Sequence, residues 1–266
     1  MTRIAMVAVS LLGIVFTPGA ARAEEITVSA AISLKDSLGE IARWHTEPTG
    51  DQVTFNFGSS GQLAGQIRQG APVDVFISAG EKQVDELEAA GLVDPATRCV
   101  IAGNRLVLIV TADTKDPPGD FKALAGEGVK RLAMGDPKTV PAGDYAAQVI
   151  ESLKLGDAVK DKLVYGTNVR QVLDYVERGE VDAGIVYHTD AMRSGDKVRV
   201  IATAEPSWHR PVTYPAVVVG ASTKQDAGRR FLNYLATGGA REILARHGFT
   251  EAPAPASTRP TRSSAP

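Results

Sequence analysis

The chain has 266 residues with a formal net charge of −2, and 44% of the residues are hydrophobic. No basic stripe runs along it, which argues against nucleic acid as a partner, and a single cysteine excludes an internal disulfide. The four histidines are scattered without the spacing of metal ligands, so neither a metal-cation site nor a cofactor is expected.

The two ends of the chain differ from the rest in composition. Residues 1–23 have the pattern of a secretory signal: Arg3 gives a positive start, residues 4–16 form an apolar run, and a small-residue Ala-Arg-Ala sequence ends at Ala23. The apolar run is too short to span a membrane. We therefore expect cleavage after Ala23 and a periplasmic mature protein. Residues 251–266 are rich in Pro, Ala, Ser and Thr, and we expect them to form a disordered tail.

Between these ends, strand-like and helix-like patterns alternate in two successive series. Short runs rich in β-branched residues predict strands, and apolar residues at helical spacing predict helices. The first series predicts strands at 25–31, 52–58, 73–79 and 105–111, and helices at 33–47, 60–70 and 81–92. The second series predicts strands at 131–136, 162–167, 183–190, 198–203 and 213–220, and helices at 142–155, 169–180 and, in two pieces, 227–249.

This alternation indicates an α/β fold in which mainly parallel sheets are flanked by helices. Two such series predict two lobes, joined by two crossing strands at 105–111 and 213–220. The expected boundaries place residues 24–104 and 214–250 in the first lobe and residues 105–213 in the second. A cleft between two lobes is a common place for a ligand.

Four junctions between a strand and the following helix carry small residues that expose backbone donors. They lie at residues 29–33, 57–61, 140–144 and 166–170, two in each predicted lobe. The N–H groups of a first helical turn have no acceptor within their own helix and carry the positive end of the helix dipole. Such helix starts bind anions without a charged side chain. If the cleft brings the four junctions together, they form a site for a compact anion.

Each junction also has a purely structural interpretation. Ser33 and Ser60 are favoured N-cap residues in any helix, and Ala142 and Gly143 fit an ordinary loop that enters a helix. Tyr187, at the end of an apolar strand, fits a packed core aromatic. Only the combination of the four junctions favours a binding site.

The paired serines of the GSSG sequence also have to be tested as nucleophiles. Ser59 and Ser60 do not stand in a G-x-S-x-G sequence, and Leu63 stands where an S-x-x-K sequence would place its lysine. No histidine with a nearby acid stands at a comparable strand end, and no phosphate-binding nucleotide loop is present. A secreted serine hydrolase remains the weaker alternative to a binding protein.

Five stretches resemble the periplasmic molybdate-binding component of ABC-type molybdate importers, in order and with matching spacing over residues 25–249. They are ITVSAAISLKDSL, FGSSGQLAGQIRQGAPVDVFISA, GDPKTVPAGDYA, VRQVLDYVERGEVDAGIVY and YPAVVV. The resemblance implies a type II periplasmic substrate-binding protein, a monomer without catalytic activity whose two lobes close on one molybdate or tungstate ion. It also implies delivery of that ion to the membrane permease of an ABC transporter.

The resemblance further implies which residues hold the oxyanion. The implied ligands are the hydroxyls of Ser33, Ser60 and Tyr187 and the backbone N–H groups of Ala142 and Val169. Asn168 stands where the family often has aspartate, which changes little if the contact next to it is a backbone donor. Gly61 and Gln62 replace polar residues frequent in the family, an exchange expected to loosen the loop slightly.

A cradle that only donates hydrogen bonds suits molybdate or tungstate, because these dianions are fully ionised at neutral pH and only accept. Phosphate keeps a proton near neutral pH and would favour a carboxylate acceptor, which none of the five positions offers. Sulfate has the same charge and shape in a smaller size. A receptor for sulfate or for a small organic anion therefore stays open as an alternative.

Overall fold

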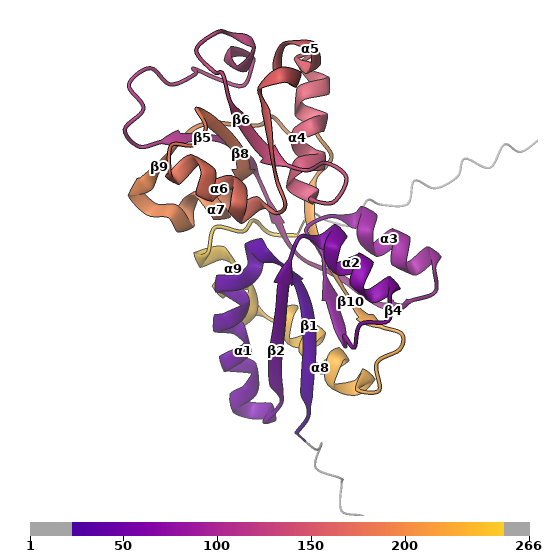
Figure 1. Ribbon diagram of the computed structural model, residues 1–266. Coiled ribbons are helices and arrows are strands. Elements are labelled where there is room, and N and C mark those ends of the chain that lie inside the picture. Colours follow the sequence, from indigo (N-terminus) through magenta and orange to yellow (C-terminus); the bar gives the residue numbers. More distant parts are fainter. Residues whose placement is uncertain (1–22, 253–266) are drawn as a thin grey trace, which may run out of the picture.

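The computed structural model describes residues 23–252, which form two lobes, each built on a five-stranded sheet (Figure 1). The expected signal segment, up to residue 22, and the expected tail, from residue 253, lie outside the described residues. The two-lobed α/β prediction is confirmed. Within residues 23–252, no helix has the length and apolar character needed to cross a membrane.

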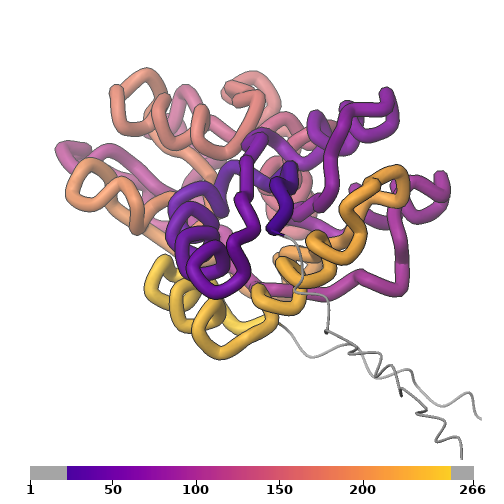
Figure 2. The backbone as a smooth tube through the Cα atoms, turned by 90° about the horizontal axis from the view of Figure 1, so that it is seen from below, coloured from indigo at the N-terminus to yellow at the C-terminus, as the bar shows by residue number. Residues whose placement is uncertain are grey.

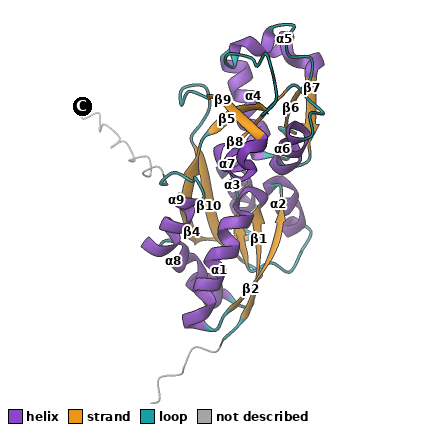
Figure 3. Cartoon of the chain, turned by 90° about the vertical axis from the view of Figure 1, so that its left-hand side faces the viewer, coloured by secondary structure: helices purple, strands orange, loops and turns teal. Residues whose placement is uncertain are grey.

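The first lobe has the strand order β2-β1-β3-β10-β4. Its strands are β1 (Glu25–Ala31), β2 (Gln52–Gly58), β3 (Val75–Ile77), β4 (Val93–Asn104) and β10 (Val212–Val219). Its helices are the 3₁₀ turn η1 (Ile32–Leu34), α1 (Lys35–Thr49), α2 (Ser60–Arg68), α3 (Glu81–Ala89), α8 (Gln225–Leu235) and α9 (Gly238–Arg246). Helices lie on both sides of the sheet (Figure 3).

The second lobe has the strand order β7-β6-β8-β5-β9. Its strands are β5 (Leu106–Thr111), β6 (Leu132–Gly135), β7 (Leu163–Gly166), β8 (Ala183–Tyr187) and β9 (Val198–Thr203). Its helices are η2 (Lys122–Ala125), α4 (Pro141–Ser152), α5 (Gly156–Val159), η3 (Lys160–Lys162), α6 (Val169–Glu177), α7 (His188–Ser194) and η4 (Gly195–Lys197).

Each sheet is mixed, where the sequence predicts mainly parallel pairing. In the first lobe β1 pairs in parallel with β2 and β3, whereas β10 runs antiparallel to β3 and β4. In the second lobe β6 pairs in parallel with β7 and β8, whereas β5 runs antiparallel to β8 and β9. The antiparallel strands β5 and β10 each begin where the chain enters a lobe from the other one, so they do not arrive through a strand–helix–strand crossover.

The chain crosses between the lobes twice, in two different ways. At the first crossing β4 ends at Asn104 and β5 begins at Leu106, so only Arg105 separates the two sheets. The second crossing is the loop of residues 204–211, which leads from β9 into β10, the strand that the sequence predicts at 213–220. Pro206 and Pro211 lie in this loop and remove two of the backbone donors that a strand would use.

The C-terminal helices return to the start of the chain. Helices α8 and α9, drawn in yellow, lie beside the indigo α1 when the molecule is seen from below (Figure 2). Phe231 of α8 is fully buried and packs edge-on against His45 of α1, with 5.2 Å between the ring centroids. The last helices therefore complete the core of the first lobe.

Strand β4 and helix α7 are among the elements that the sequence analysis missed. Strand β4 contains Pro95 and the charged residues Asp94 and Arg98 in its first half, a composition typical of a loop. It forms because it is an edge strand, in which one row of backbone donors needs no partner. The strand predicted at 183–190 ends at Tyr187, and a new helix, α7, starts at His188. Tyr187 therefore lies at a fifth strand–helix junction.

Candidate functional site

The five residues implied as ligands surround one small cavity between the lobes. The cavity volume is about 10 Å³, and all five residues are at most 4% exposed. The cavity is lined by Ala31, Ile32, Ser33, Gly58, Ser59, Ser60, Ala79, Val140, Pro141, Ala142, Val169 and Tyr187. The lobes are closed over this cavity, so a ligand has to be compact and has to enter while they are apart.

The first lobe contributes Ser60 at the start of α2. Ser59, and not Ser60 as the sequence suggested, is the N-cap of this helix, because its hydroxyl accepts the Gln62 N–H at 3.4 Å. The Ser60 hydroxyl is free of capping and instead accepts the Ala79 N–H at 3.0 Å. Both serines line the cavity, but the one-residue shift of the cap commits the Ser59 hydroxyl to α2 and leaves the Ser60 hydroxyl without a capping role.

Ser33 lies in η1, the turn that leads from β1 into α1. It forms no capping hydrogen bond, which corrects the second cap expected from the sequence. Its hydroxyl lies 3.0 Å from the hydroxyl of Tyr214, a fully buried residue of β10. The first lobe therefore presents two buried serine hydroxyls, each held from behind by a group of the same lobe.

The second lobe contributes two helix starts. Pro141 and Ala142 open α4, and Val169 opens α6 behind the N-cap Asn168, whose side chain accepts the Gln171 N–H at 3.0 Å. Asn168 is thus the side-chain cap of α6. The N–H groups of Ala142 and Val169 take part in no hydrogen bond among residues 23–252, as expected of a first turn.

The start of α4 is fixed by a very close approach to β6. A Cβ atom added to Gly143 would lie 2.0 Å from the Gly135 carbonyl oxygen, well inside van der Waals contact. Only glycine allows the helix to begin this close to the strand, and this contact sets the position of the neighbouring Ala142 N–H.

Tyr187 reaches across the cleft from the end of β8. Its hydroxyl donates to the Ala79 carbonyl of the first lobe at 3.2 Å. Burial raises the pKa of Tyr187 well above its usual value, so the hydroxyl keeps its proton and remains a donor. Tyr187 is buried as a core aromatic would be, but its hydroxyl also belongs to the cavity wall.

The cavity lining is uncharged and mostly apolar, with a few polar groups among its residues. It contains hydroxyls and helix-start N–H groups, and no Asp, Glu, His, Lys or Arg is among its residues. Such a set of donors, at the positive ends of helix dipoles, favours an anion. It leaves the serines without a general base within the cavity, which removes the geometric basis for a serine nucleophile.

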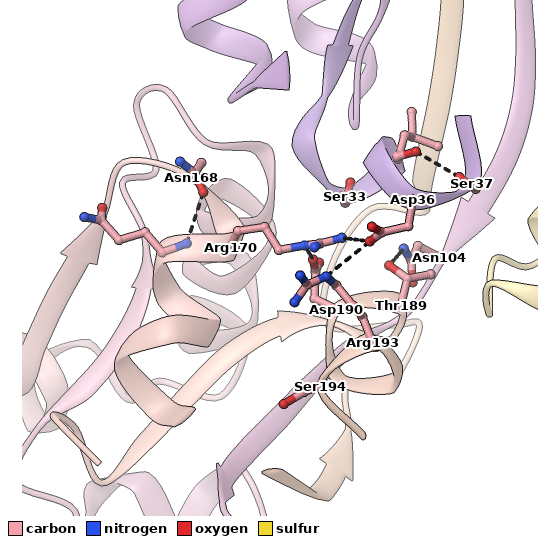
Figure 4. Close-up of polar contacts among 12 residues, drawn as sticks. Ser33, Asp36, Ser37, Asn104, Asn168, Arg170, Thr189, Asp190, Arg193 and Ser194 are labelled. Carbon is pink, nitrogen blue, oxygen red and sulfur yellow. Dashed lines mark hydrogen bonds and ion pairs between the residues drawn. The ribbon is translucent and has the colours of Figure 1, made fainter. Parts of the chain in front are cut away.

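Charged side chains gather next to the cavity and join the lobes (Figure 4). We call Asp36, Arg170, Asp190 and Arg193 the interlobe charge cluster. Asp36 of α1 accepts a hydrogen bond from Arg170 Nη2 of α6 at 2.8 Å and forms an ion pair with Arg193 Nε of α7 at 3.2 Å. Arg170 Nε also lies 2.6 Å from the fully buried Asp190. Burial alone would raise the pKa of Asp36, but the two arginines outweigh it and lower the pKa.

A backbone contact closes the lobes on the other side. The Gly61 N–H donates to the Thr139 carbonyl at 3.0 Å, and a Cβ atom on Gly61 would lie 2.5 Å from that oxygen. The sequence suggested that glycine loosens this loop. The structure shows instead that glycine allows the start of α2 to touch the backbone of the second lobe.

Sequence reasoning missed the residues that support the site. Asp36 and Arg170 are 134 residues apart in the chain, and Tyr214 is 181 residues from Ser33. Neither pair has a sequence signal of its own, because only the tertiary fold brings the partners together.

Two α/β lobes that meet over one donor-lined cavity define a binding protein of the hinge-closing class. Comparison with known proteins gives the family. The sequence matches the bacterial extracellular solute-binding protein family over residues 26–250, and the chain belongs to this family.

Three known proteins illustrate the relationship. The chain is 40% identical over 240 residues to the molybdate-binding protein ModA of Escherichia coli K12, covering 87% of this chain and 92% of the relative. It is 38% identical over 236 residues to ModA of Haemophilus influenzae, covering 86% and 91%. Among solved structures, the periplasmic molybdate-binding protein of Azotobacter vinelandii matches with a TM-score of 0.76 and 26% identity, covering 86% of this chain and 100% of that one.

Proposed function

We propose that this protein captures molybdate, and also tungstate, between its lobes and delivers the ion to the permease of an ABC importer. The observation that carries the proposal is the uncharged donor lining of the interlobe cavity. Three hydroxyls and two helix-start N–H groups suit a tetrahedral dianion that only accepts hydrogen bonds. The molybdate-binding relatives described above support the same ligand.

The proposed ligand contacts are the hydroxyls of Ser33, Ser60 and Tyr187 and the N–H groups of Ala142 and Val169. The Tyr187 proton, which is donated to the Ala79 carbonyl at 3.2 Å, would turn from that oxygen to the ligand. We propose that the protein reaches the periplasm by signal cleavage after Ala23 and acts there as a monomer without a cofactor. Its role is binding, because solute-binding proteins are defined by capture and not by catalysis.

Isothermal titration calorimetry with molybdate, tungstate, sulfate and phosphate tests the ligand. We expect heat and tight binding with the first two, and weak or no binding with the others. Sulfate bound as tightly as molybdate would contradict the proposed specificity, and binding of none of the four would exclude an inorganic oxyanion receptor.

Ser60→Ala tests the site. Loss of a hydrogen bond to a charged ligand costs about 1.5–3 kcal/mol, so the dissociation constant should rise roughly ten- to 150-fold. Ser59→Ala is the matched control, because Ser59 is the neighbouring buried serine and its hydroxyl caps α2. Equal losses of affinity in both variants would show that the Ser60 hydroxyl makes no special contact.

A further inference from the structure

A chain of buried polar groups runs from the first crossing between the lobes to Ser33. Asn104 ends β4 and Tyr214 lies on β10, so both stand where the lobes connect. Asn104 Nδ2 lies 3.0 Å from Tyr214 Oη and 3.0 Å from Thr189 Oγ1, and Tyr214 Oη lies 3.0 Å from Ser33 Oγ. Figure 4 shows Asn104 beside Thr189.

The direction of each hydrogen bond in this chain can be assigned. Asn104 Oδ1 accepts the Arg105 N–H at 2.8 Å, which fixes the orientation of the amide and turns its NH₂ group toward Tyr214 and Thr189. The Tyr214 oxygen therefore accepts from Asn104. Its single proton is left for Ser33 Oγ, the other partner of this hydroxyl among residues 23–252.

The same assignment leaves the Ser33 proton for the cavity. Ser33 Oγ accepts from Tyr214, and a serine hydroxyl has one proton to donate. Tyr214 is 0% exposed, and burial raises its pKa far above the usual value, so it does not lose the proton that it gives to Ser33. Ser33 lines the cavity, where its remaining proton faces the place of the ligand.

Ser60 shows the same arrangement with a different partner. Its oxygen accepts the Ala79 N–H at 3.0 Å, so its proton is also free to be donated. In both serines of the first lobe, the hydroxyl oxygen thus accepts one hydrogen bond from a donor of the same lobe. For Ser60 this donor is backbone, whereas for Ser33 it is a side chain that mutation can remove.

We propose that Tyr214, oriented by Asn104, is a positioning residue that makes the Ser33 hydroxyl a donor to the ligand, so that the site favours oxyanions that carry no proton. The proposal rests on the proposed function and deepens it: the site selects by hydrogen-bond direction as well as by size. A protonated oxyanion would need an acceptor. With one lone pair of Ser33 Oγ taken by Tyr214, the hydroxyl could accept from such a ligand only by turning its own proton away from the cavity, where the structure gives it no acceptor among residues 23–252.

A double-mutant cycle with Ser33→Ala and Tyr214→Phe tests whether Tyr214 acts through Ser33. In the wild-type background we expect Tyr214→Phe to raise the dissociation constant of molybdate about two- to threefold, because the released hydroxyl samples three staggered positions. In the Ser33→Ala background the same change should alter it by less than about 1.5-fold, since no hydroxyl remains to orient. An equal factor in both backgrounds would overturn the proposal.

Selectivity gives a readout that a structural role would not move. In Tyr214→Phe, molybdate affinity should fall while phosphate, measured by displacement of molybdate at about pH 8, should bind more tightly than to the wild type. There phosphate is a monohydrogen dianion, and the released Ser33 oxygen is able to accept its proton. Equal losses for both anions, or no displacement by phosphate from either protein, would refute selection by hydrogen-bond direction.

The controls separate the possible failures. Tyr145→Phe removes another buried hydroxyl, which donates to the Pro211 carbonyl at 3.3 Å, and should leave molybdate affinity unchanged. If Tyr214→Phe does not fold, Asn104→Ala replaces it in the cycle, because it removes the donor that orients Tyr214. If the wild type binds sulfate and not molybdate, the proposed function is wrong, and the cycle is read with sulfate instead.

Discussion

Asp36→Asn should release the bound ligand faster, because Asp36 is the first-lobe partner of two arginines of the second lobe. The two ion pairs, at 2.8 and 3.2 Å, break when the lobes separate. Asp36 is 42% exposed and Arg193 48% exposed, so each pair is screened and contributes about 0.5 kcal/mol. Together they stabilise the closed state by about 1 kcal/mol, which corresponds to a roughly fivefold change in the dissociation rate.

Two competing effects of the substitution have to be separated from this one. Asp36 lies in the first turn of α1, where its charge also stabilises the helix, but that contribution is the same in the open and closed states. Removing a negative charge also attracts the anion, which acts mainly on association. Arg193→Gln breaks the same contact while changing the charge in the opposite sense. Loss of the ion pair therefore raises the dissociation rate of the ligand in both variants, whereas a pure charge effect would change the ligand affinity of the two variants in opposite directions.

The assay is stopped-flow displacement of molybdate at about 0.05 and 1 M salt. The effect should shrink at high salt, where the screening length falls to about 3 Å. Glu86→Gln is the matched control, because its 3.1 Å pair with Arg68 has similar exposure and lies within the first lobe. An unchanged dissociation rate in Asp36→Asn, or an equal increase in Glu86→Gln, would refute a closing role for the cluster.

Three further predictions concern stability. Gly143→Ala should lower the free energy of unfolding by about 2–4 kcal/mol, because its Cβ would meet the Gly135 carbonyl oxygen. Gly239→Ala is the control, because Gly239 has open space around it, and it should leave the free energy of unfolding unchanged. Thermal unfolding of both variants tests this difference. Ser59→Ala should cost about 1 kcal/mol through the lost cap of α2, and an unchanged Tm would speak against capping. Burial raises the pKa of Asp190 to about 6 against the pull of Arg170. Between about pH 4 and 6 the carboxyl is therefore protonated in the folded state and ionised in the unfolded state. The free energy of unfolding falls by up to about 3 kcal/mol as pH rises through that window. Relative to the wild type, Asp190→Asn should gain stability over the same window, and a pH-independent difference in Tm would contradict this.

The fold was predictable where local pattern and tertiary environment agree. The amphipathic spacing of α6 and the apolar run of β5 identify these elements from the sequence, because one helix face and both strand faces are buried. Strand β4 was missed because only its place at the sheet edge makes Pro95 acceptable. The direction of β10 was also beyond local reasoning, since it depends on how the chain returns from the other lobe.

The site was predictable in its backbone and less so in its side chains. The helix starts with unpaired N–H groups were predicted from small residues that follow strands, and a resemblance to a known family supplied Ser33, Ser60 and Tyr187. The cap of α2 was placed one residue too late, because Ser59 and Ser60 have the same propensity and only the chain direction decides between them. The partners Tyr214 and Asp36 lie far from the site in sequence, so no local pattern marks them.

Neutral groups line the cavity and charged groups join the lobes, and because the two sets are neighbours in the sequence, ligand binding is coupled to closure of the lobes. Arg170 directly follows Val169, Asp36 follows Ser33 by three residues, and Asp190 follows Tyr187 by three residues. The stretches that lead into α1, α6 and α7 therefore each place a proposed ligand donor within about one turn of a group of the interlobe charge cluster. A ligand that draws these donors together also brings the ion pairs into contact. Because no cation is among the residues that line the cavity, the anion would be held by neutral donors alone, and opening the lobes would break these contacts and the ion pairs at once.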